Sequence, residues 1–345
     1  MDDGRPASLY TLTNANGASV EITNYGGVIV HLRMPDRNGN TAEVVQGFDT
    51  LADYTSADYI KANGHYGAII GRFANRIRGA KITLDGKTYA LDPDKNGDLD
   101  QGGTMAYFRQ VFRATPHDGA EPSLALHHTD PDGFMGFPSK VEVTITYTLT
   151  NANVLRIDFR AVTDRKTVIN LINHSYFSLA GAGPGTIDQE KLQLFAHHYT
   201  PIDAGSIPTG EIRDVKGTDF DFTQPTLLGA RLGSTDPQIA SKKGIDHNFV
   251  IDGKPGTLRI AARLADTTTG RALEIWTTQP GVQVYTANSV RPQVAHAKDY
   301  VPHGAISFQT QHYPDSPNHA NFPSTELAPG EPFHEVTEYR FSVEK

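Results

Sequence analysis

Segment 141–150 alternates apolar and polar residues without a break, and this pattern constrains the fold more than any other stretch of the chain. Its apolar residues stand at positions 141, 143, 145, 147 and 149, and Glu or Thr fills every position between them. Successive side chains of a strand point to opposite faces, so the pattern predicts a half-buried antiparallel strand. After a turn at 151–153 the alternation resumes, which predicts a second strand paired with the first.

Other strand pairs joined by turn-forming residues recur along the chain. In segment 81–91 the dipeptide Asp85-Gly86 is typical of a two-residue hairpin turn. Two further antiparallel pairs are predicted at 8–14 with 19–25 and at 257–264 with 271–278.

Helical periodicity is weak throughout. No segment carries a 3.6-residue apolar stripe over three turns, and only short helical turns are expected, near 51–59 and 227–232. The 32 glycines and 21 prolines favour many turns and short strands. Together these features predict an all-β fold, a large antiparallel β-sandwich that forms a single domain over residues 1–345.

Charge and composition exclude several classes of function. The formal net charge is −8, and the sequence has no run of Lys or Arg that would form a local basic patch. We therefore expect no nucleic-acid partner. No stretch reaches the roughly 18 apolar residues of a membrane helix, so no membrane partner is expected. The chain has no cysteine, which excludes disulfides and thiol catalysis. Residues 1–6 lack the features of a signal peptide, but a removed leader would look the same, so the compartment stays open.

A cluster of polar and aromatic residues at 173–177 (Asn-His-Ser-Tyr-Phe) follows an apolar strand pattern. His174 titrates near neutral pH, so it could donate or accept a proton in a reaction. The alternative is a buried structural histidine that Asn173 or Ser175 satisfies.

Four other stretches carry candidate ligand-binding groups. Segment 71–79 holds three arginines and Asn75, which suit the recognition of hydroxyls or a carboxylate, although a solvated basic loop would look alike. Asp246 could accept hydrogen bonds from a polyol, orient His174, or only form a turn. Gln283 and Gln309 lie on predicted strands. Amides that point inward from a strand usually bind a ligand or join a polar network.

Metal and cofactor motifs are absent from the sequence. The pairs His127-His128 and His197-His198 are adjacent, and neighbouring strand residues face opposite ways, so neither pair chelates one ion easily. The chain has no nucleophile elbow, phosphate loop or dinucleotide fingerprint. We therefore expect no metal site.

Taken in order, these stretches resemble the aldose 1-epimerases (galactose mutarotases). The matching stretches cover almost the whole chain, namely 24–27, 71–77, 173–181, 244–249, 281–288, 309–325 and 327–331. The resemblance implies a β-supersandwich that acts on a free sugar, needs no cofactor and works as a monomer or homodimer. In that family a base removes the proton of the C1 hydroxyl while an acid protonates the ring oxygen, which opens the ring.

The resemblance also implies roles for individual residues. His174 is the expected acid at the ring oxygen. Asn75 and Arg76 are expected to contact sugar hydroxyls, and Asp246 and Gln283 to hold further hydroxyls.

Two positions depart from the family pattern. Gln309 stands where members carry the glutamate base, and Gln101 stands where they carry a second histidine. An amide cannot act as a base near neutral pH. Three hypotheses follow: a mutarotase whose base is Asp100, His312 or a water held by Gln309; other sugar chemistry (elimination, lactone opening or glycoside cleavage); or a non-catalytic sugar-binding protein. We predict an aldose 1-epimerase-type enzyme, with Gln309 and Gln101 kept among its site residues.

Overall fold

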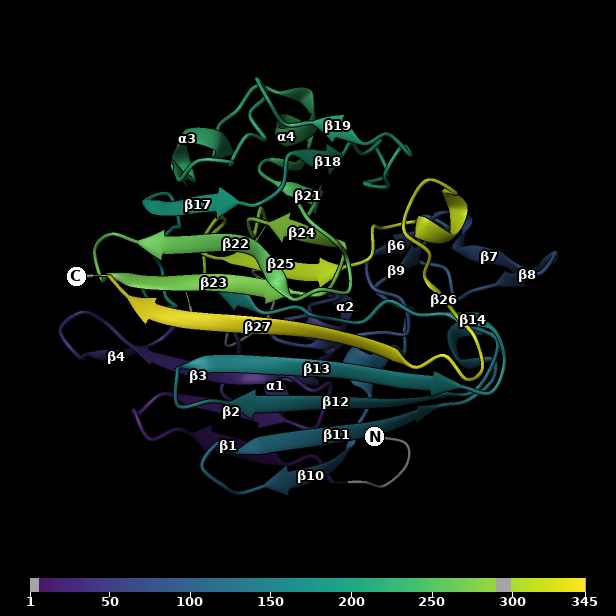
Figure 1. Ribbon diagram of the computed structural model, residues 1–345, viewed down its shortest axis with the longest axis horizontal. Helices are drawn as coiled ribbons and strands as arrows, with labels where there is room; N and C mark the ends of the chain where they lie inside the picture. The colour runs from purple at the N-terminus through teal and green to yellow at the C-terminus, as the bar shows by residue number, and fades with distance from the viewer. Residues whose placement is uncertain (1–5, 290–298, 345) are drawn as a thin grey trace.

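Three antiparallel sheets form most of the computed structural model, which describes residues 6–289 and 299–344 (Figure 1). The largest sheet has nine strands in the order β10-β11-β12-β13-β27-β23-β22-β17-β20. Its strands are β10 (Arg113–His117), β11 (Ser123–Asp130), β12 (Val141–Leu149), β13 (Val154–Thr163), β27 (Phe333–Val343), β23 (Arg271–Thr277), β22 (Arg259–Asp266), β17 (Glu190–Leu194) and β20 (Thr226–Leu227). The all-β sandwich predicted from the sequence is confirmed.

Strand β12 shows the alternation that the sequence predicts. All its odd-numbered residues from Val141 to Leu149 are buried, and the residues between them are more exposed. It pairs in register with β13, as expected for a hairpin. The long C-terminal strand β27 then joins β13 to β23, so the last strand of the chain lies between strands from its middle and its later part (Figure 1).

Two smaller sheets pack against the large one. The first has four strands, β1 (Leu9–Thr13), β2 (Ser19–Thr23), β3 (Ile29–Pro35) and β4 (Thr41–Glu43). The second has six, in the order β16 (Tyr176–Phe177), β25 (Ile306–Gln311), β24 (Gly281–Tyr285), β21 (Asp246–Val250), β18 (His198–Thr200) and β19 (Arg213–Asp214). One hydrophobic core joins all three sheets and includes Val20, Ile145 and Val284, all buried completely. Burial of this apolar surface is the main force that holds the layers together.

Four two-stranded pieces complete the strand pattern. They are β5 (Ile69–Ile70) with β15 (Ile172–Asn173), β6 (Arg76–Ile77) with β9 (Leu99–Asp100), β7 (Lys81–Leu84) with β8 (Lys87–Ala90), and β14 (Thr167–Val168) with β26 (Glu326–Leu327). The β7–β8 hairpin turns at Asp85 and Gly86, both with positive φ, as the predicted turn requires. The predicted pairs β1–β2 and β22–β23 are also present.

Helices are few and short. The described part of the chain has α1 (Leu51–Tyr54), α2 (Ala57–Lys61), α3 (Gly229–Leu232) and α4 (Pro237–Lys242). The first three lie where the sequence predicts helical turns, and α4 was not predicted. It is six residues long and begins with an Asp236 cap followed by proline, a start signal too short to show a helical period. None of the described helices has the length and apolar character needed to cross a membrane.

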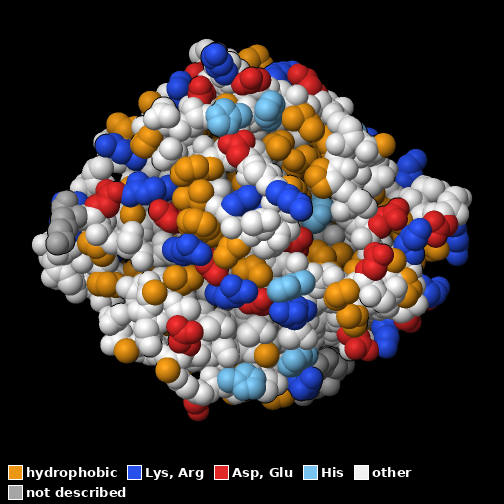
Figure 2. Space-filling view, viewed as in Figure 1, with side chains coloured by type: hydrophobic (Ala, Val, Ile, Leu, Met, Phe, Trp, Pro, Cys, Tyr) orange, Lys and Arg blue, Asp and Glu red, His pale blue; other side chains and the backbone are white. Residues whose placement is uncertain are grey.

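The face seen in Figure 2 carries side chains of both charge signs, with apolar side chains among them. In the nine-stranded sheet Arg156 bonds Asp158 at 2.7 Å and Glu338 at 2.9 Å, and Arg340 stacks on Trp276 at 4.0 Å from the ring centroid. The alternating polar residues of β13 and β27 therefore form a solvated ladder rather than a second apolar layer.

Candidate functional site

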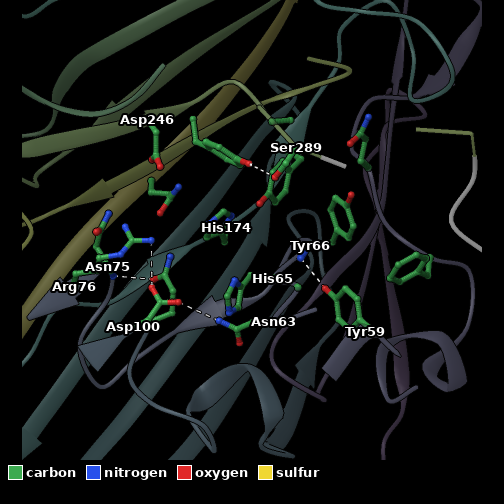
Figure 3. A pocket seen from close by; sticks show the side chains of 18 residues that line it. Tyr59, Asn63, His65, Tyr66, Asn75, Arg76, Asp100, His174, Asp246 and Ser289 are labelled. Carbon is green, nitrogen blue, oxygen red and sulfur yellow. Dashed lines mark hydrogen bonds and ion pairs between the residues drawn. The ribbon is translucent and has the colours of Figure 1, made fainter. Parts of the chain in front are cut away.

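A cavity of about 150 Å³ opens between the six-stranded sheet and the segments around β5, β6 and β9. His174 and His65 lie between a polar side with Asn75, Arg76 and Asp100 and an aromatic side with Tyr59 and Tyr66 (Figure 3). The residues that line the cavity are Gln46, Phe48, Tyr59, Asn63, Gly64, His65, Tyr66, Asn75, Arg76, Asp100, Gln101, His174, Tyr176, Asp246, Tyr285, Ala287, Ser289 and Gln309. Such a wall, polar on one side and aromatic on the other, matches a sugar with hydroxyls and apolar ring faces.

Alternation along the six-stranded sheet sends polar side chains to the cavity and apolar ones to the core. On β21, Asp246 faces the cavity, whereas the next residue, His247, is fully buried beneath the sheet. On β25, Gln309 lines the cavity, whereas Phe308 belongs to the core. The strand period of two thus builds one wall of the site.

His174 is held by the backbone on both sides. Its N–H donates to Ala68 O at 2.8 Å, and its own carbonyl accepts from Gly67 N at 3.1 Å. Its ring stacks on Tyr176 with 5.0 Å between centroids, and its Nδ1 lies 3.4 Å from Ser307 Oγ. Although only 4% exposed, His174 lines the cavity and is not enclosed in the core.

The polar side of the cavity rests on two residues from different segments that both have a left-handed backbone conformation. Asn75 has a φ of 60° and Gln101 a φ of 49°, both in the left-handed region. The two residues bind one another: Asn75 N–H donates to Gln101 Oε1 at 2.7 Å, and Gln101 N–H donates to Asn75 O at 2.8 Å. Gln101 therefore orients Asn75 in addition to lining the cavity. The next residue, Arg76, lies 3.7 Å from Asp100, which also accepts from Asn63 Nδ2 at 3.1 Å.

Only one of the three arginines of segment 71–79 faces the cavity. Arg72 is completely buried in an ion pair with Asp130, and Arg78 pairs with Asp203 at the surface. Arg72 and Arg78 are thus engaged away from the cavity, and the binding of sugar hydroxyls by Arg76 stays a prediction.

Asp246 and Gln283 act as a pair. Gln283 Nε2 donates to Asp246 Oδ1 at 2.8 Å, and Gln283 itself does not line the cavity. The structure thus places Gln283 behind Asp246, and the expectation that it holds a sugar hydroxyl directly is not supported. The other six predicted site residues all line the cavity: Asn75, Arg76, Gln101, His174, Asp246 and Gln309.

Comparisons with known proteins agree with this architecture. A sequence profile described as aldose 1-epimerase matches residues 8–340. The chain belongs to the aldose 1-epimerase family. A galactose mutarotase from Bos taurus is 36% identical over 329 residues, which cover 94% of this chain and 91% of that protein. An aldose 1-epimerase from Escherichia coli (strain K12) is 31% identical over 345 residues, covering 99% and 97%.

Solved structures show the same fold. A galactose 1-epimerase from Lactobacillus acidophilus NCFM superposes with a TM-score of 0.88 and 25% identity, covering 100% of this chain and 97% of the other. An aldose epimerase homologue from C. elegans gives a TM-score of 0.86, also at 25% identity. The supersandwich expected from the resemblance is confirmed, and the chain is an aldose 1-epimerase-type isomerase.

Two candidate replacements for the missing glutamate base differ in their position. Asp100 lines the cavity of this aldose 1-epimerase. His312 does not: it lies just past β25, where its Nδ1 is 2.9 Å from Gln279 Oε1, and burial lowers its pKa to about 4. The hypothesis that His312 serves as the base is therefore wrong, because His312 does not line the cavity.

His65 was missed in the sequence, and so were the tyrosines beside it. It lies in Gly64-His65-Tyr66-Gly67, a few residues before the arginine-rich segment, and is 7% exposed. Two signals were available: an imidazole next to a glycine, and its closeness to the segment that carries Arg76. Among the described residues, no group of three or more His, Asp or Glu side chains is placed to hold a metal ion.

Proposed function

We propose that this cavity interconverts the α and β anomers of a free aldohexose, with galactose as the first candidate because several relatives are named galactose mutarotases. The observation that carries the proposal is the position of His174. It presents an imidazole, rigidly held, in the wall of a cavity that also holds a guanidinium, two carboxylates and several amides. These are the groups that bind hydroxyls and move protons.

His174 is the general acid in this scheme. It donates a proton to the ring oxygen while the proton of the C1 hydroxyl is removed, and the ring opens to the aldehyde. Rotation about the C1–C2 bond and closure on the other face give the second anomer. The stack on Tyr176 and the approach of Ser307 fix the orientation of the imidazole, and such positioning is part of the rate enhancement.

The hydroxyls are bound by a guanidinium, a carboxylate and amides. Arg76 and Asn75 contact them on the polar side, with Gln101 holding Asn75 in place. Asp246 accepts from further hydroxyls and is held by Gln283. Gln309 donates or accepts a hydrogen bond at the anomeric end, where its neutral amide binds without taking a proton. All these groups come from one chain, so the scheme works in a monomer or a homodimer.

Polarimetry of freshly dissolved α-galactose and α-glucose tests the proposal. Wild type should speed the approach to anomeric equilibrium, and His174→Asn should reduce kcat by ~100-fold or more, the usual contribution of a general acid. His197→Asn is the matched control, because His197 has 66% of its side chain exposed and pairs with Asp252 away from the cavity. The proposal fails if wild type is inert, or if both histidine variants keep full activity.

A further inference from the structure

A second imidazole, His65, lies in the cavity close to His174. The two ring centroids are 5.7 Å apart and the rings are inclined by 31°. His65 also meets the edge of Phe108 at 4.5 Å between centroids. Two imidazoles at this separation can both reach one hemiacetal, because the ring oxygen and the C1 hydroxyl oxygen are bonded to the same carbon.

Backbone hydrogen bonds hold together the two segments that carry these imidazoles. Ala68 N–H donates to His65 O at 3.2 Å, and Ala68 O accepts from His174 N at 2.8 Å. Tyr66 N–H donates to Tyr59 Oη at 2.8 Å, which anchors the same segment on the aromatic side. The backbones of His65 and His174 are therefore held side by side, which favours the positioning that a catalytic pair requires.

The reaction needs a base that the amide of Gln309 cannot provide. Asp246 lies too far from His174 to act as this base. In the sheet, Asp246 pairs with Tyr285, and Tyr285 pairs in turn with Ser307, whose side chain lies beside His174. Two strand spacings, roughly 10 Å, therefore separate the backbones of Asp246 and Ser307. Asp100 is held by Asn63 and Arg76 on the polar side of the cavity. His65 is the proton acceptor whose ring lies next to that of His174.

We propose that His65 is the general base of the ring opening, an inference that rests on the proposed function. The neutral imidazole of His65 takes the proton of the C1 hydroxyl, and the electron pair of that O–H bond forms the C1=O bond. The bond between C1 and the ring oxygen breaks, and the ring oxygen keeps its electron pair and takes a proton from the His174 imidazolium. One proton leaves the sugar and one arrives, so the positive charge moves from His174 to His65. Closure on the other face reverses both transfers.

The test uses four forms of the full chain: wild type, His65→Gln, Gln309→Glu and the double variant. His65→Gln should lower kcat for α-galactose by ~100-fold or more, since a general base contributes that much. In the double variant a carboxylate returns to the same cavity at position 309, and it should restore activity at least ~10-fold over His65→Gln. If His65 had only a structural role, Gln309→Glu would not restore the activity of His65→Gln.

Two controls separate chemistry from folding and binding. The affinity of His65→Gln for galactose, measured by calorimetry, should stay within ~3-fold of wild type. His128→Gln alters an imidazole that is buried against Tyr107 and Phe112 outside the cavity, and it should leave kcat unchanged.

Other outcomes overturn the inference in distinguishable ways. An active wild type whose His65→Gln variant keeps its kcat refutes the role of His65 and leaves the proposed function standing. A folded, inactive His65→Gln variant that Gln309→Glu does not rescue also refutes it. If wild type is inert and Gln309→Glu is active, the native chain has no working base, and both the inference and the proposed function fail.

Discussion

Arg72 and Arg76 lie on the same segment, four residues apart, yet they stand in opposite environments. The Arg72 guanidinium is completely buried and fully engaged: Nε donates to Asp130 at 2.7 Å, Nη1 to Pro138 O at 2.7 Å, and Nη2 to Ser139 O at 3.0 Å. Arg76 keeps 28% of its side chain exposed at the cavity, and within the described residues its guanidinium makes one ion pair, at 3.7 Å.

The difference shows how one segment supplies both stability and recognition. A buried guanidinium whose three nitrogens are all hydrogen-bonded holds together the chain segments around it, and it lies out of reach of a ligand. A partly exposed guanidinium with a loose partner keeps donors available for hydroxyls. The count of arginines in the segment is less informative than the number of donors each one has already used.

Removing Arg72 should give the largest effect on stability. Arg72→Met leaves Asp130 buried without its counter-ion, and burial already raises the pKa of that carboxyl. We expect the free energy of unfolding to fall by about 3–5 kcal/mol, measured by urea denaturation. Arg78→Met is the control, since its exposed pair with Asp203 should contribute about 0–1 kcal/mol. Equal losses in the two variants would contradict the contrast between them.

A second contrast is between two histidines, the buried His247 of the six-stranded sheet and the exposed His197. His247 lies on the core side, where burial lowers its pKa to about 3. The unfolded chain therefore binds more protons than the folded one below about pH 6.5, and stability should fall as pH drops from there toward 3. From pH 6.5 to 4.5 the loss due to His247 should be about 2 kcal/mol.

His247→Gln should remove this component. The free energy of unfolding of the variant, followed by urea denaturation at several pH values, should fall less steeply than that of wild type between pH 6.5 and 4.5. His197→Gln, at an exposed site, should keep the wild-type slope. Parallel curves for wild type and His247→Gln would show that His247 does not titrate in this way.

Removing Arg76 should affect activity more than stability. Arg76→Met should lower kcat/KM for α-galactose by ~10–100-fold, equivalent to about 1.5–3 kcal/mol for a charge-assisted hydrogen bond lost at the sugar. Its free energy of unfolding should change by less than about 1 kcal/mol, because the pair with Asp100 is partly exposed. A variant that loses stability as Arg72→Met does, with kcat/KM intact, would remove the distinction between the two arginines.

Local sequence patterns were enough to predict most of the strands and several of the residues that line the cavity. Alternation over 141–150, the Asp85-Gly86 turn and the hairpins are local patterns, since a strand repeats every two residues and a two-residue turn needs particular dihedral angles. Resemblance to the family also singled out His174, Arg76 and Asp246, which do line one cavity. That the chain forms one domain stays a prediction.

Tertiary structure alone decided which polar groups are used up and which face the cavity. Nothing local distinguishes Arg72 from Arg76, because the partners of Arg72 lie at Asp130 and beyond, more than fifty positions along the chain. Gln283 was expected to contact the sugar because nothing in the local sequence reveals its partner. Only the pairing of β21 with β24 puts it behind Asp246. His65 comes beside His174 through backbone bonds between segments more than one hundred residues apart. Contacts over such separations depend on how the sheets pack, and a single sequence carries no local signal of them.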